Sequence, residues 1–280
     1  MLTFFLITTI GFEYLLVDPI AGRGGMGYGL GGDGYSLFYN PAGLALNGGN
    51  YYSISYLNYI GGTHFGYLGL EKKQLGLGVR YFNSGRIKKT NAQGEELGYF
   101  STNFIDFNLG KGIIISDFLI GGAMKLVYEK IDTLYSCGIG CDIGVLYFFL
   151  TENIQAGFTL KNIGTTIKPF IEEKERLPYE LDLGVVRKFN SGWLGVDLVK
   201  PGLLNFGVRI GCEYELTSIF GLKVTYTSLL SQIKQQTGMD FLTGINVGFE
   251  IKKAPLVINY MYTPYFSLGQ GHRITLKLGG

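Results

Sequence analysis

The spacing Gly22-x-Gly24-x-x-Gly27 is the first pattern in this sequence that could bind a ligand, because it matches the glycine fingerprint of dinucleotide-binding loops. That fingerprint works only between a strand and a helix of a βαβ unit. No such unit follows here. We therefore interpret these glycines as backbone that can take positive φ and approach other parts of the chain closely.

Catalytic and metal-binding residue types are sparse. His64 and His272 are the only histidines, and no His, Cys or Asp cluster has metal-ligand spacing. No Gly-x-Ser-x-Gly elbow is present. Glu180 and Asp182 could suggest a carboxylate pair, but a separation of two residues is ordinary alternation along one strand face. We predict no enzymatic activity, no metal and no cofactor.

The three cysteines, Cys137, Cys141 and Cys212, have no redox or metal-like spacing either. All three fall on predicted apolar strand faces. We interpret them as small apolar residues, with a disulfide as the less favoured alternative.

Many charged residues share one phase of an alternating pattern, which places them on the opposite face. Buried charges must be paired or hydrated, so this set predicts either an internal salt-bridge network or a permeation path. Its members are Arg80, Asp106, Lys125, Glu129, Asp142, Lys161, Glu180, Asp182, Arg209, Glu213, Glu215, Glu250, Arg273 and Lys277.

Composition indicates what elements must position these residues. Only 16% of the 280 residues are charged and 15% are aromatic, yet no apolar run after the first 17 residues is long enough for a helical membrane span. The net charge of +2 comes without a basic stripe, which excludes a nucleic-acid surface. Strands in which apolar residues alternate with polar ones are typical of membrane β-barrels, where the apolar residues face lipid and the polar residues face the lumen.

From Asn50 onward the period is two, as in Ile245, Val247 and Phe249 alternating with Asn246 and Gly248. The pattern predicts an all-β, transmembrane antiparallel barrel of about fourteen strands. The predicted strands are 50–60, 63–71, 74–84, 102–111, 117–131, 135–148, 153–163, 178–189, 192–200, 204–216, 219–229, 240–252, 254–263 and 268–278. The longest connections, 85–101, 164–177 and 230–239, then share one end of the barrel. A soluble β-sandwich is the alternative, with its apolar face turned to a core.

The first 49 residues differ from the rest. Residues 1–11 resemble the apolar region of a secretory signal, with an N-terminal strand as the alternative. Residues 12–49 are predicted to form a hatch inside the barrel, and 50–280 the barrel itself. We expect Asp33 to cap a short helix over 35–39 that Pro41 ends. Gly43 would then permit a tight reversal.

Asn40 is expected to hydrogen-bond nearby backbone and lock the hatch to the inner wall near Arg80 and Arg209. The alternative is a helix stop with no gating role.

The stretch from Gly32 to Ala45, which contains Asn40-Pro41-Ala42-Gly43, resembles the N-terminal plug signature of FadL-like outer-membrane proteins. Ala21 to Gly27 is similar to the lead-in of the PorV/PorQ branch. Later segments that are similar to the same branch are Leu160 to Gly164, Leu177-Pro178, Val196 to Leu198, Lys200-Pro201, Gly211 to Leu216 and Gly269 to Leu276. The chain ends Lys277-Leu278-Gly279-Gly280, without the terminal aromatic usual in such barrels.

The resemblance implies a fourteen-stranded outer-membrane barrel with a plug in its lumen. Of its two branches, we expect the PorV/PorQ-like one, a structural or protein-handling component of type IX-like secretion, because the chain is short for a FadL transporter. The alternative is a FadL-like passive channel for hydrophobic small molecules. Expected partners are outer-membrane lipid together with secreted proteins or secretion components, or with hydrophobic small molecules.

Overall fold

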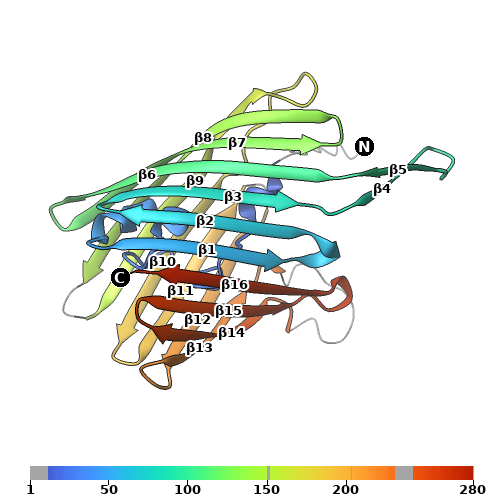
Figure 1. Cartoon of the computed structure of the whole chain (residues 1–280). Helices are drawn as coiled ribbons and strands as arrows, with labels where there is room; N and C mark the ends of the chain where they lie inside the picture. Colours follow the sequence, from blue (N-terminus) through green and yellow to red (C-terminus); the bar gives the residue numbers. More distant parts are fainter. Residues whose placement is uncertain (1–11, 150–151, 203, 231–241, 280) are drawn as a thin grey trace, which may run out of the picture.

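The computed structural model describes residues 12–149, 152–202, 204–230 and 242–279. Within these ranges fourteen antiparallel strands close into one barrel, in which β1 pairs with both β2 and β16 (Figure 1). The barrel strands are β1 (Asn50–Asn58), β2 (His64–Lys72), β3 (Leu75–Asn83), β6 (Thr102–Ile115), β7 (Phe118–Ile131), β8 (Leu134–Phe149), β9 (Ile154–Lys168), β10 (Glu180–Phe189), β11 (Gly192–Pro201), β12 (Gly207–Glu215), β13 (Phe220–Thr227), β14 (Ile245–Lys253), β15 (Leu256–Pro264) and β16 (Gln270–Leu278). The predicted fold class is confirmed. The expected signal, residues 1–11, lies outside the described residues.

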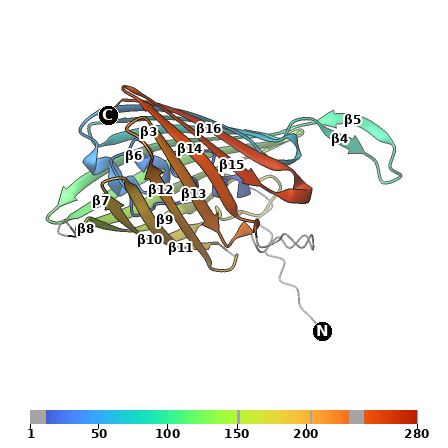
Figure 2. The ribbon, with the colours of Figure 1, turned by 90° about the horizontal axis from the view of Figure 1, so that it is seen from below.

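The connection predicted over 85–101 joins two barrel strands as expected, but it has a structure of its own. Residues 85–101 contain a two-stranded hairpin, β4 (Ile87–Thr90) and β5 (Glu96–Phe100), which projects beyond the barrel (Figures 1 and 2). Its tip is closed locally, because the N–H of Asn91 donates to the carbonyl of Glu95 at 3.0 Å. Such a hairpin depends on short-range turn chemistry and not on the long alternation by which the barrel strands are recognised.

We call the end of the barrel that carries this hairpin the loop end. The β9–β10 connection lies at the same end, as predicted. The opposite, turn end carries tight connections such as Lys73-Gln74 and Asn190-Ser191. Most of the third predicted long connection, 230–239, lies outside the described residues.

Burial alternates along the barrel strands as the sequence pattern predicts. Ile210, Val247 and Ile274 are 44%, 45% and 46% exposed on the outer face, whereas the inward Thr275 has no exposed surface. The other residues assigned to the lipid face, Phe158, Val208, Ile245 and Leu276, share this outward phase. Cys137, Cys141 and Cys212 are free thiols, also in the outward phase.

A β-bulge in β9 changes the predicted phase. Asn162 has a positive φ of 58°, and the pairing with β8 shifts between Cys141 and Ile143. Lys161 and Asn162 are consequently both buried, although neighbours in a regular strand face opposite sides. Beyond the bulge the strand continues to Lys168. The connection predicted as 164–177 is therefore shorter, and it carries an isolated bridge between Thr165 and Arg176.

Residues 12–49, the N-terminal segment, contain η1 (Glu13–Leu16), α1 (Ser36–Tyr39) and η2 (Pro41–Leu46). In Figure 1 the blue turns of this segment lie behind β1, β2 and β3, within the ring of strands. Most of its residues are buried, and η2 contacts β6, β7 and β8. Short helical turns η3 (Ile60–Gly62) and η6 (Phe266–Leu268) lie in two loop-end connections. No helix of the described residues is long and apolar enough to span a membrane.

Inward-facing glycines let the N-terminal segment lie directly on the barrel wall. A Cβ on Gly121 would lie 2.2 Å from the carbonyl carbon of Pro41, and one on Gly112 would lie 2.3 Å from the nitrogen of Ala45. On β9, a Cβ on Gly157 would lie 2.3 Å from the carbonyl oxygen of Tyr28. Backbone atoms cannot move away as side-chain tips can, so these positions require glycine.

Replacing Ile210 near the middle of β12 by Arg should lower the free energy of unfolding by about 2–4 kcal/mol, because a guanidinium would face the bilayer core. Urea titration of the refolded protein in lipid vesicles measures this change. Ile171→Arg is a matched control, since Ile171 lies in a connection and is 83% exposed. Equal stability of both variants would disprove the outward assignment of Ile210.

Gly121→Ala and Gly122→Ala form an adjacent pair on β7. We expect the first to cost about 1–3 kcal/mol through overpacking against Pro41. Gly122 points outward, where the nearest atom to an added Cβ is the Asp142 carbonyl oxygen at 3.7 Å. The second should therefore change stability by less than about 0.5 kcal/mol. Unfolding titrations of both variants provide the comparison, and equal losses would contradict direct packing of the segment on the wall.

Candidate functional site

Acidic side chains of the wall accept backbone N–H groups of the N-terminal segment. Glu129 accepts from Phe12 at 2.7 Å, Glu71 from Leu37 at 2.7 Å, and Asp197 from Gly27 at 2.6 Å. The three carboxylates come from β7, β2 and β11, far apart in sequence. Each satisfies a backbone donor that has no helix or sheet partner in this irregular segment.

Basic side chains of the wall serve the segment's carbonyl groups in the same way. Arg80 donates through Nη1 to the carbonyls of Leu15 and Val17, both at 3.1 Å. Lys223 donates to the carbonyl of Gly22 at 2.7 Å, and Arg273 donates through Nε to that of Asp18 at 2.8 Å. Wall charges of both signs thus bind uncharged backbone within the barrel.

Asn40 links the segment to the wall. It has no exposed surface, and its Nδ2 donates to the carbonyls of Tyr28 (3.0 Å), Val145 (3.2 Å) and Phe158 (3.3 Å). Its Oδ1 accepts from the N–H of Ala42 at 3.1 Å. A Cβ on Gly144 would lie 2.0 Å from this Oδ1, so a glycine in β8 makes room for the amide. Its partners are thus backbone groups, both of the segment itself and of β8 and β9.

Other residues of the expected hatch motif need a correction. Asp33 does not cap α1, whose N-cap is Tyr35 and has no side-chain cap; instead Asp33 forms an ion pair with Arg23 at 2.6 Å. Its Oδ1 also accepts from the N–H of Tyr35 at 3.1 Å, a turn contact that competes with capping.

Pro41 starts η2, and the chain does turn from α1 into η2 at Asn40. Gly43 has no positive φ. Any larger residue would clash at this position, because a Cβ there would lie 2.6 Å from the hydroxyl of Ser36 and 2.8 Å from Cα of Gly31. Ala42, beside it, has no exposed surface.

Most of the predicted lumen-facing charges are buried, and they fall into local groups. On β3 and β6 Arg80 pairs with Asp106 at 2.9 Å, and on β7 and β8 Lys125 pairs with Asp142 at 3.1 Å. The remaining groups involve β9, β10, β12, β13 and β14. Their ion pairs are Arg209 with Glu180 (3.3 Å) and Asp182 (3.1 Å), Lys161 with Glu180 (3.8 Å), and Lys223 with Glu213 (3.3 Å) and Glu250 (3.1 Å).

Three members of the predicted set are placed differently. Arg273 is buried but binds backbone, as described above, and the Thr263 hydroxyl at 2.6 Å. Glu215 is only half-buried and pairs with Lys252 at 2.6 Å. Lys277 is also half-buried and donates to the carbonyl of Asp33 at 2.9 Å. Glu180 and Asp182 both form ion pairs with Arg209, so they belong to a charge cluster and do not form an isolated carboxylate pair.

Sequence reasoning missed Glu71, Asp197 and Lys223 as contacts of the segment. Asp197 and Lys223 each stand at an inward position between apolar outward neighbours, so the alternation that found the other charges could have found these two. The predicted strand 63–71 ends at Glu71. The structure extends β2 to Lys72.

The inner face is not polar throughout, contrary to expectation. At the loop end the wall residues Leu57, Phe65 and Val127, with Leu177 of the β9–β10 connection, form one cluster with Phe12, Tyr14 and Leu15 of the segment. We call these seven residues the inner apolar cluster. The ring of Tyr14 stacks on Phe104 with centroids 4.2 Å apart. The segment therefore covers apolar surface of the wall at this end.

A small internal cavity borders Leu15 of this cluster. The cavity lined by Arg80, Asp106, Lys125, Asp142 and Lys161 has a volume of about 10 Å³, room for about one water molecule. No group of His, Cys, Asp and Glu residues in the described ranges could hold a metal ion. His64 and His272 instead pair through Nδ1 with the hydroxyls of Tyr56 at 2.7 Å and Tyr260 at 2.8 Å.

No family model and no curated protein matches the sequence. The fold of the chain does resemble that of solved structures. The Pseudomonas putida toluene transporter TodX is 13% identical over 94% of this chain and 98% of its own, with a TM-score of 0.59. The Ralstonia pickettii toluene transporter TbuX is 12% identical over 96% and 98%, also with a TM-score of 0.59. At this identity the likeness concerns the fold alone: the chain is a closed fourteen-stranded barrel built like these two toluene transporters.

Proposed function

We propose that this protein is an outer-membrane channel for hydrophobic small molecules, in which the N-terminal segment is the hatch. The inner apolar cluster is the observation that carries the proposal. Apolar wall residues inside a barrel that is otherwise lined by charge would offer a hydrophobic compound a place to leave water. Phe12, Tyr14 and Leu15 now cover that wall, and a ligand would take their place.

The hydrogen-bond pattern makes displacement of the hatch feasible. Arg209 has Glu180 and Asp182 as partners within the wall, and Lys223 has Glu213 and Glu250. These two cations would stay paired if the hatch moved, whereas Glu71 and Asp197 would exchange backbone N–H partners for water. We assign the charged network the role of a prop for barrel and hatch, and not of a selectivity path.

The likeness to two proteins described as toluene transporters supports the same proposal, and small aromatic hydrocarbons are the substrate class we favour. In this proposal residues 1–11 direct export, and the loop end faces the outside, as longer loops do in barrels of this class. The role in type IX-like secretion that the PorV/PorQ resemblance implies has no support from the solved structures that share the fold.

One observation favours that second candidate. The projecting hairpin exposes Leu97 by 59% and Tyr99 by 55%, an apolar surface of the kind that protein partners use. If the protein handles secreted polypeptides, deletion of residues 87–100 should abolish their co-purification from native membranes and leave uptake of small molecules unchanged. Unchanged co-purification would dismiss this candidate.

Asn40→Ala should raise the passage of small hydrophobic dyes through reconstituted vesicles severalfold. The change removes the hydrogen bonds to the wall carbonyls of Val145 and Phe158 and leaves these buried groups without the amide donor. Each such hydrogen bond contributes about 0.5–1.5 kcal/mol to stability. The barrel itself should keep its resistance to heat, because no ladder hydrogen bond is lost. Fluorescence of a vesicle-trapped dye acceptor follows the uptake.

Asn190→Ala at the exposed β10–β11 turn is the control, since this residue lies away from the hatch. It should behave like the parent. If the Asn40 variant also takes up dye at the parental rate, Asn40 is a local turn residue and the gating role is lost.

A further inference from the structure

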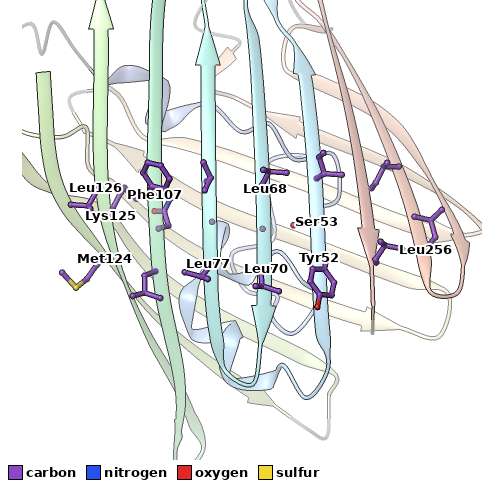
Figure 3. A pocket seen from close by; sticks show the side chains of 18 residues that line it. Tyr52, Ser53, Leu68, Leu70, Leu77, Phe107, Met124, Lys125, Leu126 and Leu256 are labelled. Atoms are coloured by element: carbon purple, nitrogen blue, oxygen red, sulfur yellow. The ribbon is translucent and has the colours of Figure 1, made fainter. Parts of the chain in front are cut away.

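The outer wall of the barrel contains an apolar groove of about 740 Å³ over strands β1, β2, β3, β6 and β7 and the adjoining β15 and β16. Figure 3 shows side chains such as Leu70, Leu77 and Met124 standing on neighbouring strands around it. Its volume falls within the roughly 300–1,000 Å³ of small-molecule sites. The groove lies on the face that the alternation directs toward lipid.

Strand pairing places the groove residues in one continuous row. Pairing joins Tyr52 to Leu70, Leu70 to Leu77, Leu77 to Leu109 and Leu109 to Met124 across β1, β2, β3, β6 and β7. On the other side, Tyr52 pairs with Leu278, and Leu278 with Leu256. The groove therefore runs across the wall with long apolar side chains from every strand.

The inner side of the same wall packs closely on the N-terminal segment. Gly76, Gly78 and Gly110 face inward, where an added Cβ would lie 3.0, 3.0 and 2.5 Å from side-chain atoms of Leu44 or Leu37. Because these glycines have no side chain to hold the wall away from the N-terminal segment, the wall lies close upon it. The outer surface is recessed over the same strands.

Lysines stand at the turn-end border of the groove. Lys72 pairs with Leu75 and Leu75 with Lys111, so the two lysines lie in one row, two residues from Leu70 and Leu109 along their own strands. Both are exposed and in the outward phase, and no ion pair of the described residues includes either. Ammonium groups at the edge of a membrane attract anionic headgroups.

We propose that this groove is a binding site for an anionic phospholipid, with an acyl chain along Leu70, Leu77 and Leu109 and the phosphate at Lys72 and Lys111. The lysine stems can extend along the wall while their charges reach the headgroup region. The proposal rests on the barrel lying in a membrane and not on what passes through it.

The shape of the groove argues against a second copy of the chain as its occupant. A two-fold dimer places the same patch of each subunit against the other. Hollow would then meet hollow, and the apolar side chains would border an unfilled space, which forfeits their packing energy. A flexible acyl chain can fill the recess instead.

Native mass spectrometry of the purified protein with dioleoylphosphatidylglycerol or dioleoylphosphatidylcholine tests the site. The parent should retain the anionic lipid preferentially. The double variant Lys72→Gln/Lys111→Gln should retain it on the order of twentyfold less. Lys130→Gln is the matched control, because Lys130 is an outward, exposed lysine near the loop end of the same wall.

A second variant tests the groove without a charge change. Leu77→Trp fills the recess and should lower retention of both lipids, whereas Val247→Trp on β14 should not. A difference in gel migration between heated and unheated samples verifies that each variant is folded. Equal retention of the two lipids by the parent, unchanged retention in Leu77→Trp, or a dimer peak that this substitution removes would overturn the proposal.

Discussion

The structure depends on one requirement: the backbone of the N-terminal segment must find hydrogen-bond partners inside a closed barrel. Only short helical turns occur in residues 12–49, so most N–H and C=O groups there lack a regular partner. The wall supplies carboxylates such as Asp197 for the donors and cations such as Arg80 for the acceptors. Inward glycines supply the space. Charge and small size on the inner face are thus two parts of one solution.

This solution holds the segment firmly without making it part of the barrel. Each contact to Asn40 or Glu71 is a separate bond of modest net energy, and no strand of the closed ladder runs through the segment. The barrel wall carries its own ion pairs. In the proposed channel, a segment held in this way would be released contact by contact, whereas removal of a strand would open the barrel.

The shared fold with toluene transporters does not by itself determine a function, since barrels of one architecture serve many tasks. The two candidate functions are distinguished by local groups of residues. The inner apolar cluster and Asn40 favour small-molecule passage, and the exposed hairpin favours a protein partner. The groove on the outer wall belongs to neither task, because it concerns only the surrounding lipid.

The sequence by itself determined the barrel strands, their number and the facing of residues such as Ile210 and Asp182. Lumen and lipid impose opposite demands on successive residues of a strand, so period two is written locally. Only the tertiary structure decided that Asn40 meets Val145 and Phe158, and that Phe12 joins Phe65 in an apolar cluster. These contacts join residues far apart in the chain, and no local pattern encodes which inward positions come together when the barrel closes around its N-terminal segment.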